Sequence, residues 1–162
     1  MFMYAFDFNF MSLFLSLRAH ISQFFNEHEA ALEDFKKLRL VAREQEDLTL
    51  KMESYEKMGE CYKQIRRHEN QLKCYKKALE ISWQKGDKEG ELRMYENMGI
   101  AYYYMGFLEK SAYYNDRFVR GKSEKLDSKI KTIYGNDEHN VRKQKNNNIP
   151  TVYRNLTFKK YK

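Results

Sequence analysis

The sequence repeats itself at an interval of 40 residues, and this self-similarity restricts the possible fold more than any other feature. Residues 55–62 read YEKMGECY and residues 95–102 read YENMGIAY, so five of the eight positions are identical. The same interval relates His28 to His68. Equal spacing over so long a stretch is the signature of a repeat protein, in which similar units stack on their neighbours.

Each unit is predicted to hold two helices. Apolar residues in 50–64 and in 68–84 fall mostly three or four positions apart, which places them on one face of a helix. The pattern returns at 88–105 and at 108–120, and a further second helix is predicted at 28–44. The links between helices are short, which favours antiparallel neighbours. The sequence therefore predicts an all-α chain, a short solenoid of antiparallel helix pairs.

The composition agrees with this fold class. The chain has 162 residues, of which 42% are hydrophobic and 15% aromatic, so a packed core is possible. It contains one Pro and seven Gly, which are too few for the many turns of an all-β domain. Its two Cys cannot build a disulfide scaffold, so we expect a reducing compartment such as the cytoplasm.

Three glycines have predicted roles in the repeat. Gly86 suits the left-handed position that ends a helix, and Asp87 suits the N-cap of the next helix. Gly59 and Gly99 lie inside helices, where Gly costs about 1 kcal/mol relative to Ala. Their recurrence predicts a close approach of two helices, at which a Cβ would clash. The residues assigned to packing of the repeats are Tyr55, Met58, Gly59, Tyr62, Tyr75, Ala78, Tyr95, Met98, Gly99 and Tyr102.

The N-terminal end of the chain is less regular. Residues 1–27 form an apolar segment in which Leu15 and Ala19 stand 40 positions before Tyr55 and Gly59. We therefore expect the segment to supply the first helix of a degenerate repeat. A signal peptide or a membrane anchor is the alternative, although no basic residue precedes the apolar run and the run is shorter than a bilayer span requires.

The C-terminal end changes character after Asp127. An apolar pattern begins there, and we expect it to form a separate helix that caps a repeat region spanning 28–134. Residues 135–162 show no helical or strand period and are predicted to be a disordered basic tail. Seven basic residues lie in this tail without any acidic residue after position 138, so the other 23 basic residues balance 23 acidic ones. The basic residues of the tail are Arg142, Lys143, Lys145, Arg154, Lys159, Lys160 and Lys162.

The repeat resembles the tetratricopeptide repeat. An aromatic-x-x-Met-Gly-x-x-Tyr pattern on the first helix, followed by a small or aromatic residue and Ala on the second, is similar to that family, whose usual period is about 34 residues. The longer period, with Gly-Asp between units, resembles the Leu-Gly-Asn repeat adaptor proteins of cell polarity. Residues 93–102 read RMYENMGIAY, which is close to that group's R-x-x-x-N-L-G-N-A-Y signature. Lys57, Ile100 and Asn115 depart from the pattern.

The resemblance implies a protein–protein interaction scaffold or adaptor, whose first helices line a concave groove for a segment of a partner. By position, Asn97 would hydrogen-bond the partner's backbone and Arg93 would bind a carboxylate. Tyr103 and Tyr104 would supply rigid contact area. The alternative is a solvated polar face that binds nothing. The residues assigned to the groove are Lys57, Glu60, Lys63, Gln64, Arg93, Asn97, Ile100, Tyr103 and Tyr104.

A second functional interpretation rests on the basic tail. Its charge would attract an acidic surface, such as that of tubulin, and the chain would then be a structural component of a large ciliary, axonemal or microtubule-associated assembly. The expected location would be the cilium or cytoskeleton rather than the general cytoplasm. We expect neither nucleic acid nor a membrane as the partner.

The sequence shows no catalytic or metal-binding pattern. Cys61 and Cys74 lack the spacing of a zinc motif. The Gly121-Lys122-Ser123 segment lacks the earlier glycine of a phosphate-binding loop, since Asp116 stands in its place. We therefore predict that the chain is not an enzyme and uses no cofactor, metal or small-molecule substrate.

Overall fold

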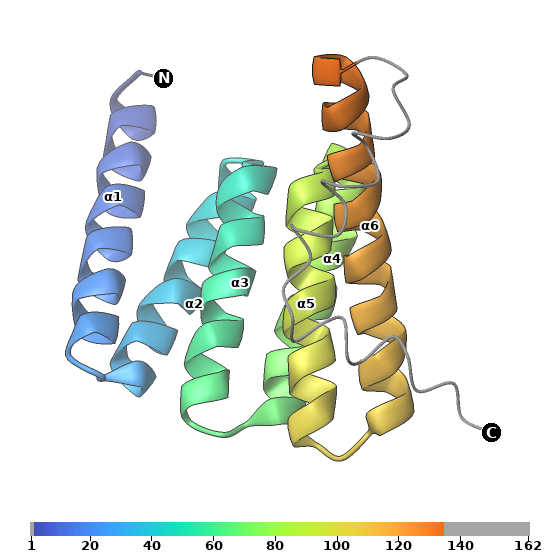
Figure 1. The fold of residues 1–162 in the computed structure, drawn as a ribbon. Helices are drawn as coiled ribbons and strands as arrows, with labels where there is room; N and C mark the ends of the chain where they lie inside the picture. The colour runs from blue at the N-terminus through green and yellow to red at the C-terminus, as the bar shows by residue number, and fades with distance from the viewer. Residues whose placement is uncertain (1, 135–162) are drawn as a thin grey trace.

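The structure, a computed structural model, describes residues 2–134 as six helices joined by short turns (Figure 1). No strand occurs within this range, so the predicted all-α class is confirmed. The predicted tail at 135–162 lies outside the described residues. In chain order the helices are α1 (Phe2–Phe24), α2 (His28–Glu44), α3 (Leu48–Gln64), α4 (His68–Lys85), α5 (Lys88–Tyr104) and α6 (Leu108–Tyr134).

The five turns within residues 2–134 share one backbone geometry. In each turn, the amide that follows a left-handed residue donates to the carbonyl five positions earlier, as Asp87 N does to Ser82 O at 2.9 Å. Glycine provides the left-handed residue in only two turns, so in the other three a residue with a side chain adopts this conformation. The backbone thus repeats every 20 residues, twice as often as the sequence. The residues with positive φ are Asn26, Glu46, Arg66, Gly86 and Gly106.

Aspartates begin two of the first helices. The Asp47 Oδ1 atom accepts hydrogen bonds from the amides of Thr49 and Leu50 at 2.8 and 3.0 Å. The Asp87 Oδ1 atom accepts from the amide of Gly90 at 2.9 Å, so the predicted N-cap is confirmed. These bonds satisfy amides that have no partner within their own helices.

Position 127 stands 40 residues after Asp87, but no helix begins there. Position 127 lies inside α6, which runs without a break from Leu108 to Tyr134. The expected helix end at 120 and the separate capping helix after Asp127 therefore do not form. By the 20-residue spacing the next turn would need a left-handed residue at Leu126. Leucine favours the helix and strongly disfavours the left-handed conformation, so α6 continues.

The helices stack as a solenoid in which each helix packs on its neighbours in the chain (Figure 1). The first helices of the three pairs, α1, α3 and α5, also adjoin one another. The Gln23 Nε2 atom of α1 lies 3.4 Å from the Cys61 Sγ atom of α3. Farther along, Arg93 of α5 forms an ion pair with Glu56 of α3. The first helices therefore form one continuous layer.

The core contains the apolar faces of the helix pairs. In α1, Leu15 and Ala19 are buried together with Phe35 of α2, so α1 occupies the place of a first helix in the expected phase. In the next pair, a Cβ added to Gly59 would collide with the ring of Tyr75, which is 1% exposed. The close approach predicted at this glycine is therefore present.

Candidate partner-binding surface

The residues assigned to partner binding lie on two helices of the first-helix layer. On α3, positions 57, 60 and 64 fall on successive turns, and on α5 the row runs through 93, 97, 100 and 104. We call this surface the first-helix face. It comprises Lys57, Glu60, Lys63, Gln64, Arg93, Asn97, Ile100, Tyr103 and Tyr104.

Ion pairs neutralise the middle of the first-helix face. The Lys57 Nζ atom lies 2.9 Å from Glu60 Oε2 within α3. The Arg93 Nε and Nη2 atoms lie 3.2 and 3.4 Å from the two carboxylate oxygens of Glu56. The hydrogen bond with Glu56 also raises the pKa of Arg93 above its usual value. The carboxylate that we expected a partner to bring to Arg93 is thus provided by the chain itself, and this contact joins α3 to α5.

Asn97 and Ile100 lie between Arg93 and the end of α5. Both side chains are half-buried. Within residues 2–134 the Asn97 side chain makes no hydrogen bond, so its amide is available both to donate and to accept. The position is consistent with the backbone contact that the resemblance implies for this residue.

Aromatic side chains are exposed at the end of α5. Tyr103 and Tyr104 are 62% and 63% exposed. The Tyr104 ring stacks on the imidazole of His68, with ring centroids 5.9 Å apart and planes only 10° apart. The two rings also line an open cavity of about 430 Å³, which we call the Tyr104 pocket. It is lined by Lys63, Gln64, Arg66, His68 and Tyr104.

The Tyr104 pocket is positively charged. Its lining holds two cations and no carboxylate. Neither Lys63 nor Arg66 forms an ion pair within the described part of the chain. The first-helix face thus has a neutral middle, where Lys57 and Arg93 are paired, and a basic end at the Tyr104 pocket. Sequence analysis missed Arg66 and His68, because it treated them as turn residues, although an antiparallel pair brings that turn beside the end of α5.

The residues assigned to repeat packing occupy the interior, except for two tyrosines that are half-buried. Tyr55 and Tyr62 are the half-buried pair. The buried members are Met58, Gly59, Tyr75, Ala78, Tyr95, Met98, Gly99 and Tyr102.

In the third helix pair, polar groups of α6 pack against the glycine of α5. The Ser111 Oγ atom of α6 donates to the carbonyl oxygen of Gly99 at 2.8 Å. A Cβ on Gly99 would collide with the side-chain oxygen of Asn115, which stands 40 positions after Tyr75. The departure at Asn115 noted in the sequence therefore keeps the close approach but replaces the aromatic ring.

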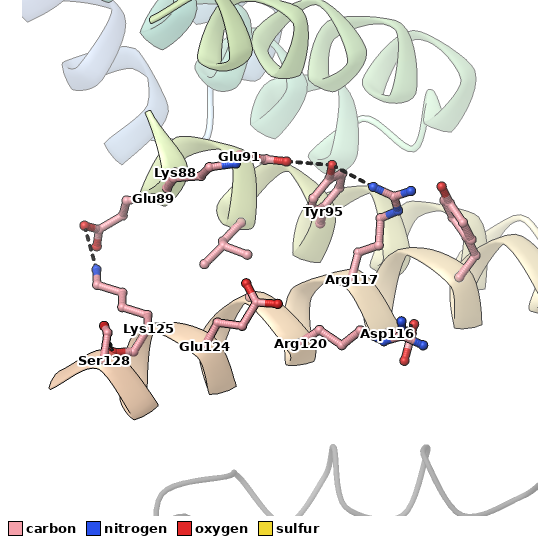
Figure 2. A pocket seen from close by; sticks show the side chains of 13 residues that line it. Lys88, Glu89, Glu91, Tyr95, Asp116, Arg117, Arg120, Glu124, Lys125 and Ser128 are labelled. Carbon is pink, nitrogen blue, oxygen red and sulfur yellow. Dashed lines mark hydrogen bonds and ion pairs between the residues drawn. The ribbon is translucent and has the colours of Figure 1, made fainter. Parts of the chain in front are cut away.

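A second hollow lies between α5 and α6 and was not predicted (Figure 2). Its volume is about 990 Å³, and its lining carries charges of both signs. Figure 2 shows Lys125 of α6 paired with Glu89 of α5 at 3.1 Å, and Tyr95 donating to Glu91 at 2.8 Å. The guanidinium of Arg117 lies 5.7 Å from the centroid of the Tyr95 ring. The lining of this hollow thus combines charged groups with the apolar parts of Leu92, Tyr95 and Tyr113.

The two cysteines of the described residues lie in the core. Cys61 and Cys74 are buried, and burial raises the pKa of the Cys74 thiol to about 11. Burial likewise raises the pKa of Cys61. Both thiols are thus protonated at neutral pH, and a protonated thiol is a poor nucleophile. Residues 2–134 hold no group of three or more His, Cys, Asp or Glu side chains able to bind a metal ion, and none of their helices is apolar over a length that would cross a membrane.

Comparison with known proteins supports the fold. No family model and no curated protein matches the sequence. Sixteen chains of solved structures do match, and among them is the crystal structure of BtubC (BKLC) from P. vanneervenii. The TM-score is 0.58 at 18% sequence identity, and the match covers 75% of this chain and 46% of that one. This chain thus corresponds to about half the length of BtubC, and the likeness shows an all-α helical repeat.

Proposed function

We propose that the chain is a protein–protein interaction module of the tetratricopeptide type, which binds an acidic segment of a partner along its first-helix face. The observation that carries this proposal is the basic Tyr104 pocket, where two cations without ion pairs lie beside an exposed, stacked aromatic ring. The adjoining row on α5 ends in this pocket, so a segment lying along α5 would reach it.

The chemistry of the face suits an extended peptide. The Asn97 side-chain amide would donate a hydrogen bond to the peptide backbone and accept another from it. Lys63 and Arg66 would hold a carboxylate, and hydrogen bonds of that kind are about twice as strong as neutral ones. The exposed faces of Tyr103 and Tyr104 would cover apolar parts of the peptide at a low cost in conformational entropy. No step of this function is catalytic.

A photo-crosslinking experiment tests the proposal. The full chain would carry p-benzoylphenylalanine at Tyr103, and the control chain would carry it at Lys76, an exposed residue of α4. Both would be irradiated in native extract, and the products identified by mass spectrometry. We expect a defined partner at Tyr103 only, with an acidic crosslinked peptide. Equal products at the two positions would refute the proposal.

Charge reversal then tests the chemistry of the pocket. Lys63→Glu combined with Arg66→Glu should abolish that crosslink, because the pocket would repel a carboxylate. Lys73→Glu combined with Lys76→Glu is the matched control on exposed residues of α4 and should leave the crosslink unchanged. Loss of the crosslink in both double variants would mean that net charge, rather than the pocket, attracts the partner.

A structural role in a ciliary or microtubule-based assembly is the second proposal, and the placement of charge in the sequence favours it. Residues 140–162 hold seven Lys or Arg and no Asp or Glu, and attraction of such a tail to an acidic surface such as tubulin would weaken steeply with salt. Deleting 135–162 should abolish a tail-driven contact and leave one made by the Tyr104 pocket intact. The cytoplasm is the proposed location for the first function and the cilium or cytoskeleton for the second.

A further inference from the structure

Helix α1 has two apolar faces, and the solenoid covers only one of them. Leu15, Ala19 and Ser22 point into the core and are buried. The opposite face carries large apolar side chains that remain exposed, among them Leu17 at 59% and Phe24 at 81%. At 3.6 residues per turn, the two sets lie about half a turn apart around the helix. The exposed set is Phe10, Leu13, Phe14, Leu17, Ile21 and Phe24, which we call the outer face of α1.

The outer face of α1 is larger than the apolar patches that monomeric proteins usually expose. A buried aromatic side chain covers about 150–250 Å² and a Leu or Ile somewhat less, so these partly exposed residues leave on the order of 700 Å² uncovered. The largest patch on a typical monomer is about 300–600 Å². An interface of standard size buries about 800 Å² on each partner, so the outer face supplies most of the area that a stable contact needs.

We infer that the outer face of α1 binds the same face of a second copy, with the two helices antiparallel across a two-fold axis at Leu17. Five of the six outer-face positions are arranged symmetrically about this residue, and the sixth, Phe14, has His20 as its counterpart. Phe10 and Phe24 stand seven positions before and after it, and Leu13 and Ile21 stand four positions before and after it. A two-fold axis would therefore place Phe against Phe and Leu against Ile, which is the self-complementarity that an isologous dimer requires.

Charge placement disfavours the other occupants of this face. A head-to-tail contact would set the outer face of α1 on the hollow between α5 and α6, whose lining is charged. An anionic membrane attracts helices rich in Lys and Arg, but the only such residue from 2 to 24 is Arg18. Its Nε atom donates to Asp34 Oδ2 at 2.6 Å, so this cation is already held by α2. Apolar contact with an identical neutral face needs no charge partner.

Light scattering of the full chain tests the dimer. We expect twice the 19.7 kDa mass of one chain at micromolar concentration. Leu17→Glu would place two carboxylates against each other at the axis, so the dissociation constant of the dimer should rise at least 100-fold. Leu108→Glu changes a similarly exposed leucine of α6 and should leave the dimer intact. A native chain that is monomeric, or a dimer that Leu17→Glu does not weaken, would overturn the inference.

Disulfide trapping tests the antiparallel arrangement. Leu17→Cys should form a covalent dimer on mild oxidation, since a residue on the axis faces its own copy. Leu13→Cys and Ile21→Cys should link efficiently when mixed and poorly when each is oxidised alone. The native Cys61 and Cys74 are buried and provide a low background. Efficient linking of Leu13→Cys to itself would contradict this arrangement, as would a monomer that sediments with phosphatidylserine vesicles through α1. The dimer does not rest on the proposed partner-binding function.

Discussion

The helix pairs α3–α4 and α5–α6 solve the same packing problem with different chemistry. In α3–α4 the Tyr75 ring packs directly on Gly59, while in α5–α6 the Gly99 carbonyl accepts a hydrogen bond from Ser111 and Asn115 replaces the ring. Glycine is retained in both pairs because the two helices approach closely in both. Each pair therefore keeps a glycine where a Cβ would collide with the second helix, while the group that fills the space differs.

The two pairs also differ in their surroundings. α3–α4 has a neighbouring helix on each side, whereas α5–α6 has one only on the side of α4, within the described residues. In a solenoid the stability of a unit is approximately its own contribution plus that of its interfaces. We therefore expect substitutions in α3–α4 to cost more than the matched substitutions in α5–α6.

The largest expected difference concerns the residue that faces each glycine. Tyr75→Ala should lower the free energy of unfolding by about 3–5 kcal/mol, because it removes a buried aromatic ring and leaves a cavity. Asn115→Ala removes a smaller, half-buried amide and should cost about 1 kcal/mol. Urea denaturation followed by circular dichroism would measure both values. Equal costs would mean that the two pairs do not differ in the way proposed.

The glycines themselves should give the next largest difference. Gly59→Ala forces a Cβ into the Tyr75 ring, and overpacking costs about 1–3 kcal/mol, which exceeds the ~1 kcal/mol gain in helix propensity. Gly99→Ala meets the side-chain oxygen of Asn115, which can rotate away, so the net change should be close to zero. Thermal melts of the two variants would decide whether Gly59 is the more sensitive position.

Removing one hydroxyl from each pair isolates the polar contact. Ser111→Ala deletes the bond to the Gly99 carbonyl and should cost about 1 kcal/mol. Ser54→Ala is the matched control, because its Oγ atom donates to Leu50 O within its own helix and joins no second helix. We expect the control to change the urea midpoint less. A larger effect of the control would show that the contact between α5 and α6 contributes little.

The smallest expected effect is a pH dependence at Glu91, where α5 meets α4. Burial acts to raise the pKa of Glu91, but hydrogen bonds from Lys88, Tyr95 and Trp83 outweigh it and bring the value below 4.5. A lowered folded-state pKa stabilises the protein above pH 4.5, and this contribution is lost as the pH falls below it. Glu91→Gln should therefore make the melting temperature fall less between pH 6 and pH 3.5 than it does in the native chain. The corresponding change in the free energy of unfolding should be less than about 1 kcal/mol. An unchanged difference would exclude Glu91 as a contributor.

Much of the fold could be predicted from the sequence, because helix periodicity and the 40-residue interval are both local patterns. The ends of α2, α3 and α4 came within two residues of expectation. The length of α6 could not be predicted from the repeat. Asp127 stands 40 positions after Asp87, but Leu126 before it does not favour the left-handed conformation that a turn requires. The Glu56–Arg93 ion pair was also missed, because the two residues are 37 positions apart in the sequence and meet only when α5 packs beside α3.

The candidate site was predicted in outline only. The rows on α3 and α5 followed from the resemblance, and the exposed Tyr103 and Tyr104 lie where it implied. The basic pocket depends on Arg66, whose left-handed backbone no local signal indicates. An arginine in that conformation is costly in isolation, so its position is fixed by the packing of α3 on α4 rather than by its own preference.

The even spacing of the turns determines how such a chain can change in length. Excising residues 47–86 would join Glu46 to Asp87 and bring α5 onto α2 in the orientation that α3 now has, because one complete unit is removed. Loss of a single residue inside α3 would instead rotate everything that follows in that helix by about 100° and turn its apolar side toward water. We therefore expect growth or shortening by whole modules to be tolerated and a change of one residue to disrupt the register.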